Sequence, residues 1–298
     1  MNTPSGNKTV RELIQVTSEY LEGKGVESAR LNTERLLADV LGLSRLELYV
    51  QHDRPVLGAE LGRFREVVRR RAAGEPLQQI LGMTEFYSHP FQVAPGVFIP
   101  RPETERLVEE SVPLLAPDDH RLLAPVALEI GCGSGIIGIC LALEVPRLTV
   151  HASDINPRAV ELSRHNAHLL GVDARVTCHQ GTRFEPFPEH LRGKVDLVVS
   201  NPPYVRREDI AGLAVEVAAH DPHEALDGGP DGLVFYRAIA SEMGKWLRPG
   251  GHVAVEIGDD QGAQVRDIFA ASGGQEIRII KDYADRDRVV IARVGQPD

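Results

Sequence analysis

A glycine-rich segment in the middle of the chain, Glu129–Gly135, constrains the fold more than any other feature of the sequence. It lies between an apolar run that is typical of a buried strand, Val126–Ile130, and a run with helical character, Ile136–Leu143. Glycines allow the backbone to turn sharply and to approach a ligand closely. The next predicted strand, Leu148–Ser153, leads directly into Asp154, whose carboxylate can accept the hydrogens of two ribose hydroxyl groups. This order predicts a parallel α/β sheet with a ligand at its carboxyl edge.

From residue 126 onward, predicted strands and helices alternate. The last two predicted strands, Ile277–Lys281 and Arg288–Arg293, have no helix between them. They can pair only as a hairpin, so the final strand should run antiparallel to the others. We therefore predict an α/β fold with a doubly wound sheet and helices on both faces. The other predicted strands are Arg175–Cys178, Val195–Ser200 and His252–Ile257, and further helices are predicted from Pro157 to about Leu170, over Gly232–Leu247 and over Gln261–Ala271.

The first 80 residues have a different pattern. Apolar side chains recur with i, i+3, i+4 spacing in three segments between Val10 and Val68, and these segments are separated by Gly and Pro, which predicts a bundle of four or five helices. Residues 83–99 combine aromatic and β-branched side chains with turn residues at His89-Pro90 and Pro95-Gly96, which indicates a short β-hairpin. We expect a helical domain over residues 1–82, a hairpin linker over 83–100 and an α/β domain over 101–298.

Charge and composition narrow the classes of partner. Of the 298 residues, the first 80 carry 12 basic and 11 acidic side chains, whereas the remainder carries 21 basic and 32 acidic ones. An acidic α/β domain is a poor non-specific partner for a phosphate backbone, so we expect no direct nucleic-acid substrate. No apolar run approaches the roughly 18 residues of a membrane span, and the N-terminus has no signal-peptide pattern, so we expect a cytoplasmic protein without membrane association. The cysteines, Cys132, Cys140 and Cys178, have neither disulfide-framework nor metal-ligand spacing, and we predict no metal.

The second informative segment, Asn201-Pro202-Pro203-Tyr204, follows the predicted strand Val195–Ser200. Two consecutive prolines remove two backbone N–H donors and favour extended backbone before each of them. The Asn201 side-chain oxygen and the Pro202 carbonyl oxygen can each accept one hydrogen of a planar –NH2 group, against which Tyr204 can pack. The alternative is an ordinary turn that ends a strand. Because the first and fourth strands flank the switch point of such a sheet, we expect this segment to face the glycine segment across one cleft.

The glycine segment alone does not choose the ligand. Residues Gly133–Gly138 also satisfy the G-x-G-x-x-G pattern of dinucleotide-binding proteins, so a nicotinamide-dependent oxidoreductase is one alternative. Two observations disfavour it. Glu129 lies two residues before the first glycine, and a carboxylate there suits the cationic S-adenosylmethionine better than a pyrophosphate. In addition, Asn201–Tyr204 has no evident role in hydride transfer. A catalytically silent binding module is disfavoured because both halves of the site are present.

The chain resembles the HemK/PrmC family of release-factor glutamine methyltransferases over nearly its whole length. The segment Phe98–Glu105 (Phe-Ile-Pro-Arg-Pro-Glu-Thr-Glu), combined with a helical N-terminal domain, is the most specific part of the resemblance. Asn-Pro-Pro-Tyr alone is shared with DNA and RNA amino-methyltransferases. The other matching segments are Pro76–Gly82, the glycine segment, Asn201–Tyr204, Ala225–Gly229 with Asp231–Leu233, and Asp282–Arg288.

The resemblance implies a class I S-adenosylmethionine-dependent methyltransferase fold: a Rossmann-like, seven-stranded sheet with an antiparallel last strand, plus a small N-terminal helical bundle that docks the protein substrate. It implies methylation of the side-chain amide nitrogen (N5) of the glutamine in the Gly-Gly-Gln motif of peptide-chain release factors. The alternative is amino-methylation of another protein glutamine, such as one in a ribosomal protein, or of a nucleic-acid base. The resemblance assigns catalysis to Asn201, Pro202 and Tyr204, and substrate binding to Asn201, Pro202, Pro203 and Tyr204. The residues to which it assigns cofactor binding are Glu129, Gly131, Cys132, Gly133, Ser134, Gly135, Asp154, Thr182, Arg183 and Asn201.

The sequence departs from the family pattern after the third strand of the sheet. There the family usually has an acidic residue followed by an aromatic one, next to the adenine. This chain has Thr182 and Arg183 instead. We expect Thr182 to hydrogen-bond the adenine and Phe184 to supply the missing aromatic ring.

Overall fold

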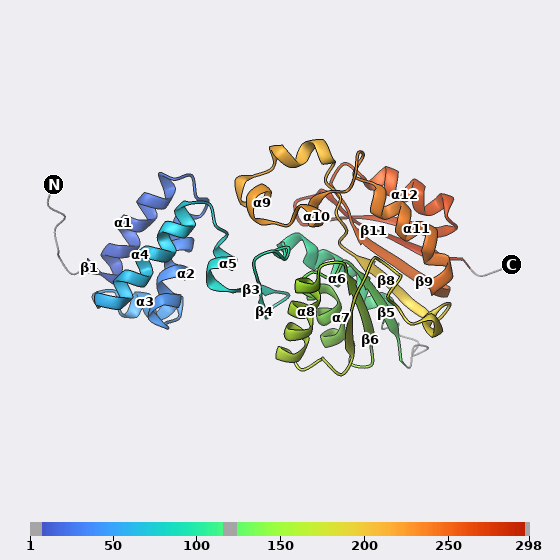
Figure 1. The fold of residues 1–298 in the computed structure, drawn as a ribbon, viewed down its shortest axis with the longest axis horizontal. Helices are drawn as coiled ribbons and strands as arrows, with labels where there is room; N and C mark the ends of the chain where they lie inside the picture. The colour runs from blue at the N-terminus through green and yellow to red at the C-terminus, as the bar shows by residue number, and fades with distance from the viewer. Residues whose placement is uncertain (1–7, 116–123, 296–298) are drawn as a thin grey trace. The chain divides into compact units, whose positions relative to one another are not determined.

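The structure, a computed structural model, describes residues 8–115 and 124–295. It divides into two compact units, Met1–Met83 and Thr84–Asp298, which are described separately below. Figure 1 shows that the first unit is helical and that the second contains the large sheet. No helix in the described part of the chain is long and apolar enough to cross a membrane.

Unit 1 is a small helical bundle. Apolar side chains at the predicted helical spacing are buried, as at Val10, Leu13 and Ile14, and they pack with Leu36 and Phe64 in one core. Two of its helices begin with capping boxes, in which a Thr or Ser side chain and a Glu three residues later satisfy each other's backbone N–H groups. Its elements are β1 (Lys8–Thr9), α1 (Val10–Glu22), α2 (Ala29–Leu41), α3 (Arg45–Val50), β2 (Pro55–Val56), α4 (Gly58–Ala72) and α5 (Leu77–Leu81).

Unit 2 is built around a seven-stranded sheet with the order β10-β11-β9-β8-β5-β6-β7. Strands β5 to β9 run parallel to one another, and β11 is antiparallel to both β9 and β10. The sheet therefore confirms the predicted fold class, including the antiparallel last strand. The strands are β5 (Val126–Ile130), β6 (Thr149–Asp154), β7 (Val176–Gln180), β8 (Val195–Ser200), β9 (Leu247–Glu256), β10 (Gly274–Lys281) and β11 (Asp287–Val294).

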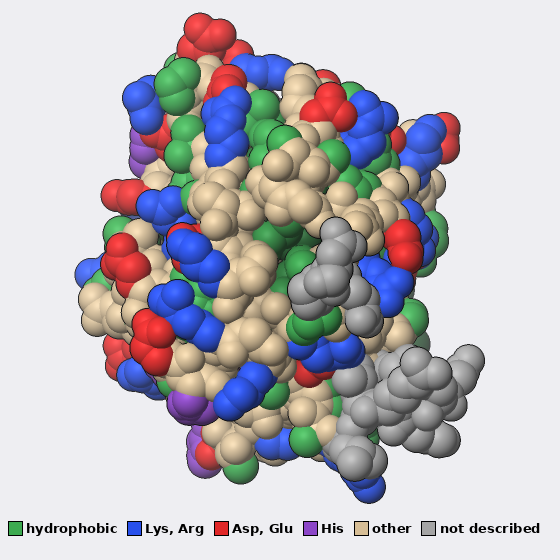
Figure 2. All heavy atoms as spheres, turned by 90° about the vertical axis from the view of Figure 1, so that its right-hand side faces the viewer, with side chains coloured by type: hydrophobic (Ala, Val, Ile, Leu, Met, Phe, Trp, Pro, Cys, Tyr) green, Lys and Arg blue, Asp and Glu red, His purple; other side chains and the backbone are tan. Residues whose placement is uncertain are grey.

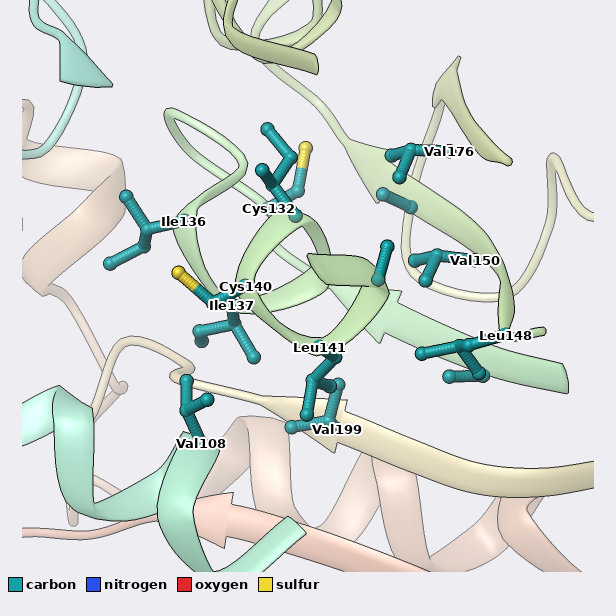
Figure 3. Packing of buried hydrophobic residues seen from close by; sticks show 14 of the residues in the cluster. Val108, Cys132, Ile136, Ile137, Cys140, Leu141, Leu148, Val150, Val176 and Val199 are labelled. Carbon is teal, nitrogen blue, oxygen red and sulfur yellow. The ribbon is translucent and has the colours of Figure 1, made fainter. Parts of the chain in front are cut away.

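Helices cover both faces of this sheet. On one face, α6 (Glu105–Leu115), α7 (Ile136–Glu144) and α8 (Pro157–Leu169) contribute to a single apolar core. Figure 3 shows part of it, with Val108 of α6 and Leu141 of α7 near Val199 of β8. On the other face, α11 (Val234–Trp246) and α12 (Gly262–Ala271) pack on alternate strand residues. Burial on both faces explains why the central strands are almost continuously apolar.

The segment that enters unit 2 forms a hairpin, but its turn differs from the predicted one. The strands are β3 (Met83–Phe86) and β4 (His89–Gln92), so His89-Pro90 begins a strand and is not a turn. Tyr87 and Ser88 make the turn, both with positive φ (51° and 62°), as the right-handed twist of a two-residue hairpin requires. Phe86 and Phe91 are buried in the same core as α6 and α7, so the hairpin is packed onto unit 2.

No helix or strand was predicted between β8 and α11, and the structure has short helices there. They are a 3₁₀ helix (Arg207–Gly212), α9 (Val215–His220) and α10 (His223–Leu226). A buried carboxylate, Asp221, links α9 to α10 and pairs with Arg101 at 2.5 Å. The same carboxylate accepts a hydrogen bond from the Ile99 N–H, which ties this region to the chain that leads into α6.

On the side of the molecule shown in Figure 2, acidic and basic side chains are intermixed.

Candidate active site

A cavity of about 920 Å³ opens at the carboxyl ends of the parallel strands in unit 2. Its wall includes the residues that follow β5, β6, β7 and β8, as expected for a doubly wound sheet. The predicted site residues that line it are Gly131, Cys132, Gly133, Ser134, Asp154, Thr182, Arg183, Asn201, Pro202, Pro203 and Tyr204. The structure thus brings the glycine segment and Asn201–Tyr204 to one cavity. Among the described residues, no group of three or more His, Cys, Asp or Glu side chains is arranged to hold a metal ion.

The glycine segment turns around the end of β6. The N–H groups of Gly131 and Cys132 both donate to the Ser153 carbonyl oxygen, at 2.8 and 3.0 Å. Gly131, Gly133 and Gly135 all have positive φ (72°, 54° and 82°), a conformation that other residues rarely adopt. Gly135 does not line the cavity but precedes α7, where a Cβ atom would lie 2.3 Å from the Ser163 hydroxyl oxygen. Because these three residues have no side chains, the backbone of Gly131–Gly135, which we call the glycine cradle, can lie close to a ligand.

Asp154 holds a fixed carboxylate on the cavity wall. Its Oδ2 atom accepts from the Gly133 N–H and its Oδ1 atom from the Asn156 N–H, both at 2.9 Å. Burial raises the pKa of Asp154, and these backbone donors oppose that shift. Because a carboxylate has about four acceptor positions, both oxygens retain capacity for hydroxyl groups of a ligand.

Glu129 is placed behind the cradle and not on the cavity wall. Its side chain is buried, its Oε2 atom accepts from the Gly138 N–H at 3.1 Å, and its Oε1 atom has no partner among the described residues. Burial raises its pKa to about 8. A neutral carboxyl group at this place supports the first turn of α7, to which Gly138 belongs.

We expect Glu129→Gln to remove a pH dependence of stability. A carboxyl group with an ordinary pKa near 4.5 when unfolded and about 8 when folded favours the native state less as pH rises through that interval. The melting temperature of the ligand-free wild type should therefore fall relative to the variant by several degrees between pH 5 and pH 8. Scanning calorimetry across this range measures the difference. A difference that does not change with pH would contradict the assignment of a neutral Glu129.

Asn201 follows β8 directly, and a hydrogen bond of its amide group fixes the orientation of the side chain. Its Nδ2 atom donates to the Thr104 hydroxyl oxygen at 3.2 Å, so its Oδ1 atom is left for the cavity. Neither this oxygen nor the Pro202 carbonyl oxygen accepts a hydrogen bond within the described residues. The two acceptors are therefore available to a donor in the cavity.

Tyr204 is held at both its backbone and its ring. Its carbonyl oxygen accepts from the Gln261 Nε2 atom at 3.0 Å, and its hydroxyl donates to Glu256 Oε1 at 3.4 Å. Burial raises the pKa of its hydroxyl group, so the ring is neutral at physiological pH. Thr104, Glu256 and Gln261 were not predicted as site residues. Thr104 was noted only as part of the segment Phe98–Glu105. Polar residues that act on a ligand through a neighbouring side chain have no local sequence pattern of their own.

The loop after α10 packs against the chain that leaves Asn201–Tyr204. Both backbone groups of Val205 bond to this loop: its N–H donates to the Leu226 carbonyl oxygen at 3.0 Å, and its carbonyl oxygen accepts from the Gly228 N–H at 2.8 Å. A Cβ atom on Gly228 would lie 2.8 Å from the Tyr204 Cα atom, and one on Gly232 would lie 2.5 Å from its carbonyl oxygen. Only glycine permits this close approach of two backbones.

Comparison with known proteins places the chain in a family. A model of the PrmC N-terminal domain matches residues 12–82, and a model of the methyltransferase small domain matches residues 108–241. The chain is 43% identical over 287 residues to the release factor glutamine methyltransferase of Geobacter sulfurreducens, which covers 96% of this chain and 97% of that protein. The chain belongs to the release factor glutamine methyltransferase family. The HemK/PrmC resemblance is thereby confirmed.

Other relatives agree with this family assignment. The release factor glutamine methyltransferase of Streptomyces coelicolor is 40% identical over 293 residues, covering 98% of this chain and all of that protein. A solved methyltransferase structure from Pyrococcus furiosus has a TM-score of 0.50 at 17% identity, covering 79% of this chain and 99% of that one, and shows the likeness of fold.

This family member differs from our expectation after β7. Thr182 and Arg183 do line the cavity, and the backbone of Arg183 has positive φ (51°), with its carbonyl oxygen accepting from the Ser153 hydroxyl at 2.7 Å. Phe184 is directed into the core instead, where its ring stacks on Trp246 with centroids 5.8 Å apart. The expectation that Phe184 supplies a ring to the cavity is therefore wrong. The tight turn at Arg183 alternates the directions of neighbouring side chains and sends Phe184 to the opposite side.

Proposed function

We propose that the protein transfers a methyl group from S-adenosylmethionine to the side-chain amide nitrogen (N5) of the glutamine in the Gly-Gly-Gln motif of peptide-chain release factors. The observation that carries this proposal is the pair of free acceptors at Asn201 and Pro202 facing the glycine cradle across one cavity. An –NH2 group on a planar carbon has two hydrogens that match them. The names of the relatives supply the protein substrate.

The cradle fits S-adenosylmethionine, which supplies a methyl group on a positively charged sulfur. Asp154 would accept the ribose hydroxyl groups, because its two oxygens are already fixed by backbone donors. The backbone of Gly131–Ser134 would line the remainder of the molecule, with Thr182 and Arg183 near the base. Glu129 and Gly135 would act one layer behind, by holding the cradle in shape.

Positioning would be the main contribution of Asn201, Pro202 and Tyr204 to the reaction. An amide nitrogen is a poor nucleophile because its lone pair is delocalised, so alignment at roughly 3–3.5 Å from the methyl carbon is needed. S-adenosylmethionine, when bound, would supply the methyl group and keep the electron pair of its carbon–sulfur bond. The amide nitrogen would bond to the methyl carbon and release its proton afterwards. A ligand without the –NH2 group leaves the acceptors unpaired, at a cost of about 1–3 kcal/mol, which favours glutamine.

We further propose that residues 1–82 dock the release factor and that 83–100 connect them to the catalytic domain. Unit 1 carries exposed large apolar side chains on α1 and α3, namely Val16, Tyr20, Leu46, Tyr49 and Val50. Exposed apolar side chains that gather on a domain are typical of protein-binding surfaces.

Transfer of labelled methyl groups tests the function directly. The wild-type protein is incubated with labelled S-adenosylmethionine and a release factor, the same factor with the motif glutamine replaced by alanine, a ribosomal protein fraction, or DNA. We expect label only in the unaltered release factor. Equal labelling of both release-factor versions, or labelling of DNA, would contradict the proposal. In the same protein, S-adenosylhomocysteine should raise the melting temperature and NAD should not, because a ligand stabilises only the fold that binds it.

A further inference from the structure

A short chain of polar side chains extends from Asn201 away from the cavity. Asn201 donates to the Thr104 hydroxyl oxygen at 3.2 Å, and Thr104 is fully buried in the 3₁₀ helix Pro102–Thr104 that precedes α6. Beyond Thr104 lies Glu256, the last residue of β9, which is the parallel neighbour of β8. Its carboxyl group is also buried, with 2% of its surface exposed. The only role given to this carboxyl group above is to accept the hydrogen bond of the Tyr204 hydroxyl.

Several groups surround the Glu256 side chain. Burial raises the pKa of Glu256 to about 7, and the neighbouring Thr104 side chain and the charge of Arg288 lower it. The Oε2 atom of Glu256 is buried and has no hydrogen-bond partner among the described residues. Tyr204 donates to its Oε1 atom at 3.4 Å, and the nearby charge of Glu103 opposes ionisation. The backbone of Glu256 is fixed as well, because its carbonyl oxygen accepts from the Tyr236 hydroxyl at 3.0 Å.

A hydroxyl group has one hydrogen, and this determines the direction of the chain. Because Thr104 accepts from Asn201, its own hydrogen must go to another acceptor. The Oε2 atom of the neighbouring Glu256 is a buried acceptor without another partner, so Glu256 is the group placed to take this hydrogen. We propose that Glu256 and Thr104 are positioning residues that orient the Asn201 amide, with its –NH2 end toward Thr104 and its oxygen toward the substrate. This inference rests on the proposed function and adds two residues to it.

The orientation matters because the two ends of an amide have similar shape and opposite hydrogen-bonding character. If Thr104 donated its hydrogen to Asn201, the amide would turn and present –NH2 to the cavity. It would then meet the –NH2 group of a glutamine, donor against donor. The Pro202 carbonyl oxygen alone would accept, and the nitrogen would lose its alignment. Glu256 also contacts Tyr204, so a single carboxylate acts on both ends of the Asn201–Tyr204 segment.

Three variants separate this role from simple packing. Thr104→Val keeps the shape of the side chain and removes the hydroxyl, Thr104→Ser keeps the hydroxyl, and Glu256→Gln keeps the size but can donate to Thr104. We expect Thr104→Val and Glu256→Gln to lower kcat for release-factor methylation about 100-fold, with the Kd for S-adenosylhomocysteine within about twofold of the wild type. Thr104→Ser should restore kcat to within about fivefold. Wild-type kcat in both of the first two variants would overturn the inference, as would a Thr104→Ser variant as slow as Thr104→Val.

A second measurement needs no substrate. The ¹⁵N–¹H signals of the Asn201 side-chain amide, identified by their loss in Asn201→Ala, report its hydrogen bond in the free protein. We expect these signals to move in Thr104→Val and in Glu256→Gln and to stay near the wild-type position in Thr104→Ser. Signals that do not move in the first two variants would overturn the inference even if the wild type methylates release factors. Conversely, absence of transfer by the wild type would contradict the proposed function while these signals still decide the orientation of Asn201.

Discussion

Asn201→Ala is expected to lower the rate of methyl transfer to a release factor about 100- to 1,000-fold while the Kd for S-adenosylhomocysteine changes less than about threefold. The variant removes the side-chain oxygen that, with the Pro202 carbonyl oxygen, faces the cavity without another partner. Its loss removes one of the two acceptors that align the amide nitrogen with the methyl carbon. Single-turnover rates with labelled cofactor, together with calorimetric titration of S-adenosylhomocysteine, measure both quantities.

Gln180→Ala is the matched control for this variant. Gln180 also carries an amide group at the end of a parallel strand, but it is exposed and does not line the cavity. Its rate and affinity should equal those of the wild type. If Asn201→Ala transferred methyl groups at the wild-type rate, Asn201 would have no part in positioning the substrate.

Asp154→Ala is expected to weaken binding of S-adenosylmethionine and S-adenosylhomocysteine about 100-fold or more. Hydrogen bonds between a carboxylate and two hydroxyl groups contribute roughly 1.5–3 kcal/mol each, and the variant also leaves the Gly133 and Asn156 N–H groups without their acceptor. At saturating cofactor the transfer rate should recover much more than the affinity does. Titration calorimetry and the dependence of the rate on cofactor concentration separate these effects.

An exposed carboxylate far from the cavity serves as the control for Asp154. Asp173, between α8 and β7, lies 3.5 Å from His168 and does not line the cavity, so its replacement by alanine should not alter cofactor affinity. Equal affinities of Asp154→Ala and the wild type would show that the ligand does not contact this carboxylate, and would move the cofactor away from the carboxyl end of β6.

Those parts of the fold that depend on local pattern could be predicted from the sequence. The bounds of β5 and β8 were predicted to the residue, because each is a short apolar run enclosed by turn residues. The antiparallel last strand followed from the lack of a helix between β10 and β11. The hairpin turn was placed wrongly because His89-Pro90 looks like a turn, whereas tertiary packing of Phe91 draws these residues into a strand.

Only those residues of the candidate site that line the cavity and belong to a continuous sequence motif could be predicted. Residues behind the motifs have no sequence spacing to mark them, because Thr104, Glu256 and Gln261 come from separate elements and meet only through the fold. Phe184 is the opposite case, a residue that the sequence placed at the cavity and that lies elsewhere. Its place next to Thr182-Arg183 suggested the cavity, but the positive φ of Arg183 sends its ring into the core. Direction of a side chain after a tight turn depends on backbone angles that sequence pattern does not determine.

The pairing of β5 with β8 has a consequence for how the protein acquires its site. These strands lie side by side, with Ile130 opposite Ser200, although 70 residues separate them along the chain. During synthesis the cradle emerges long before Asn201–Tyr204, and a nascent chain that ends before β8 has only half of the cavity. Such distant pairings form late in folding because a long loop must close first. A ligand that contacts both strands would therefore bind and stabilise only chains in which this pairing has formed.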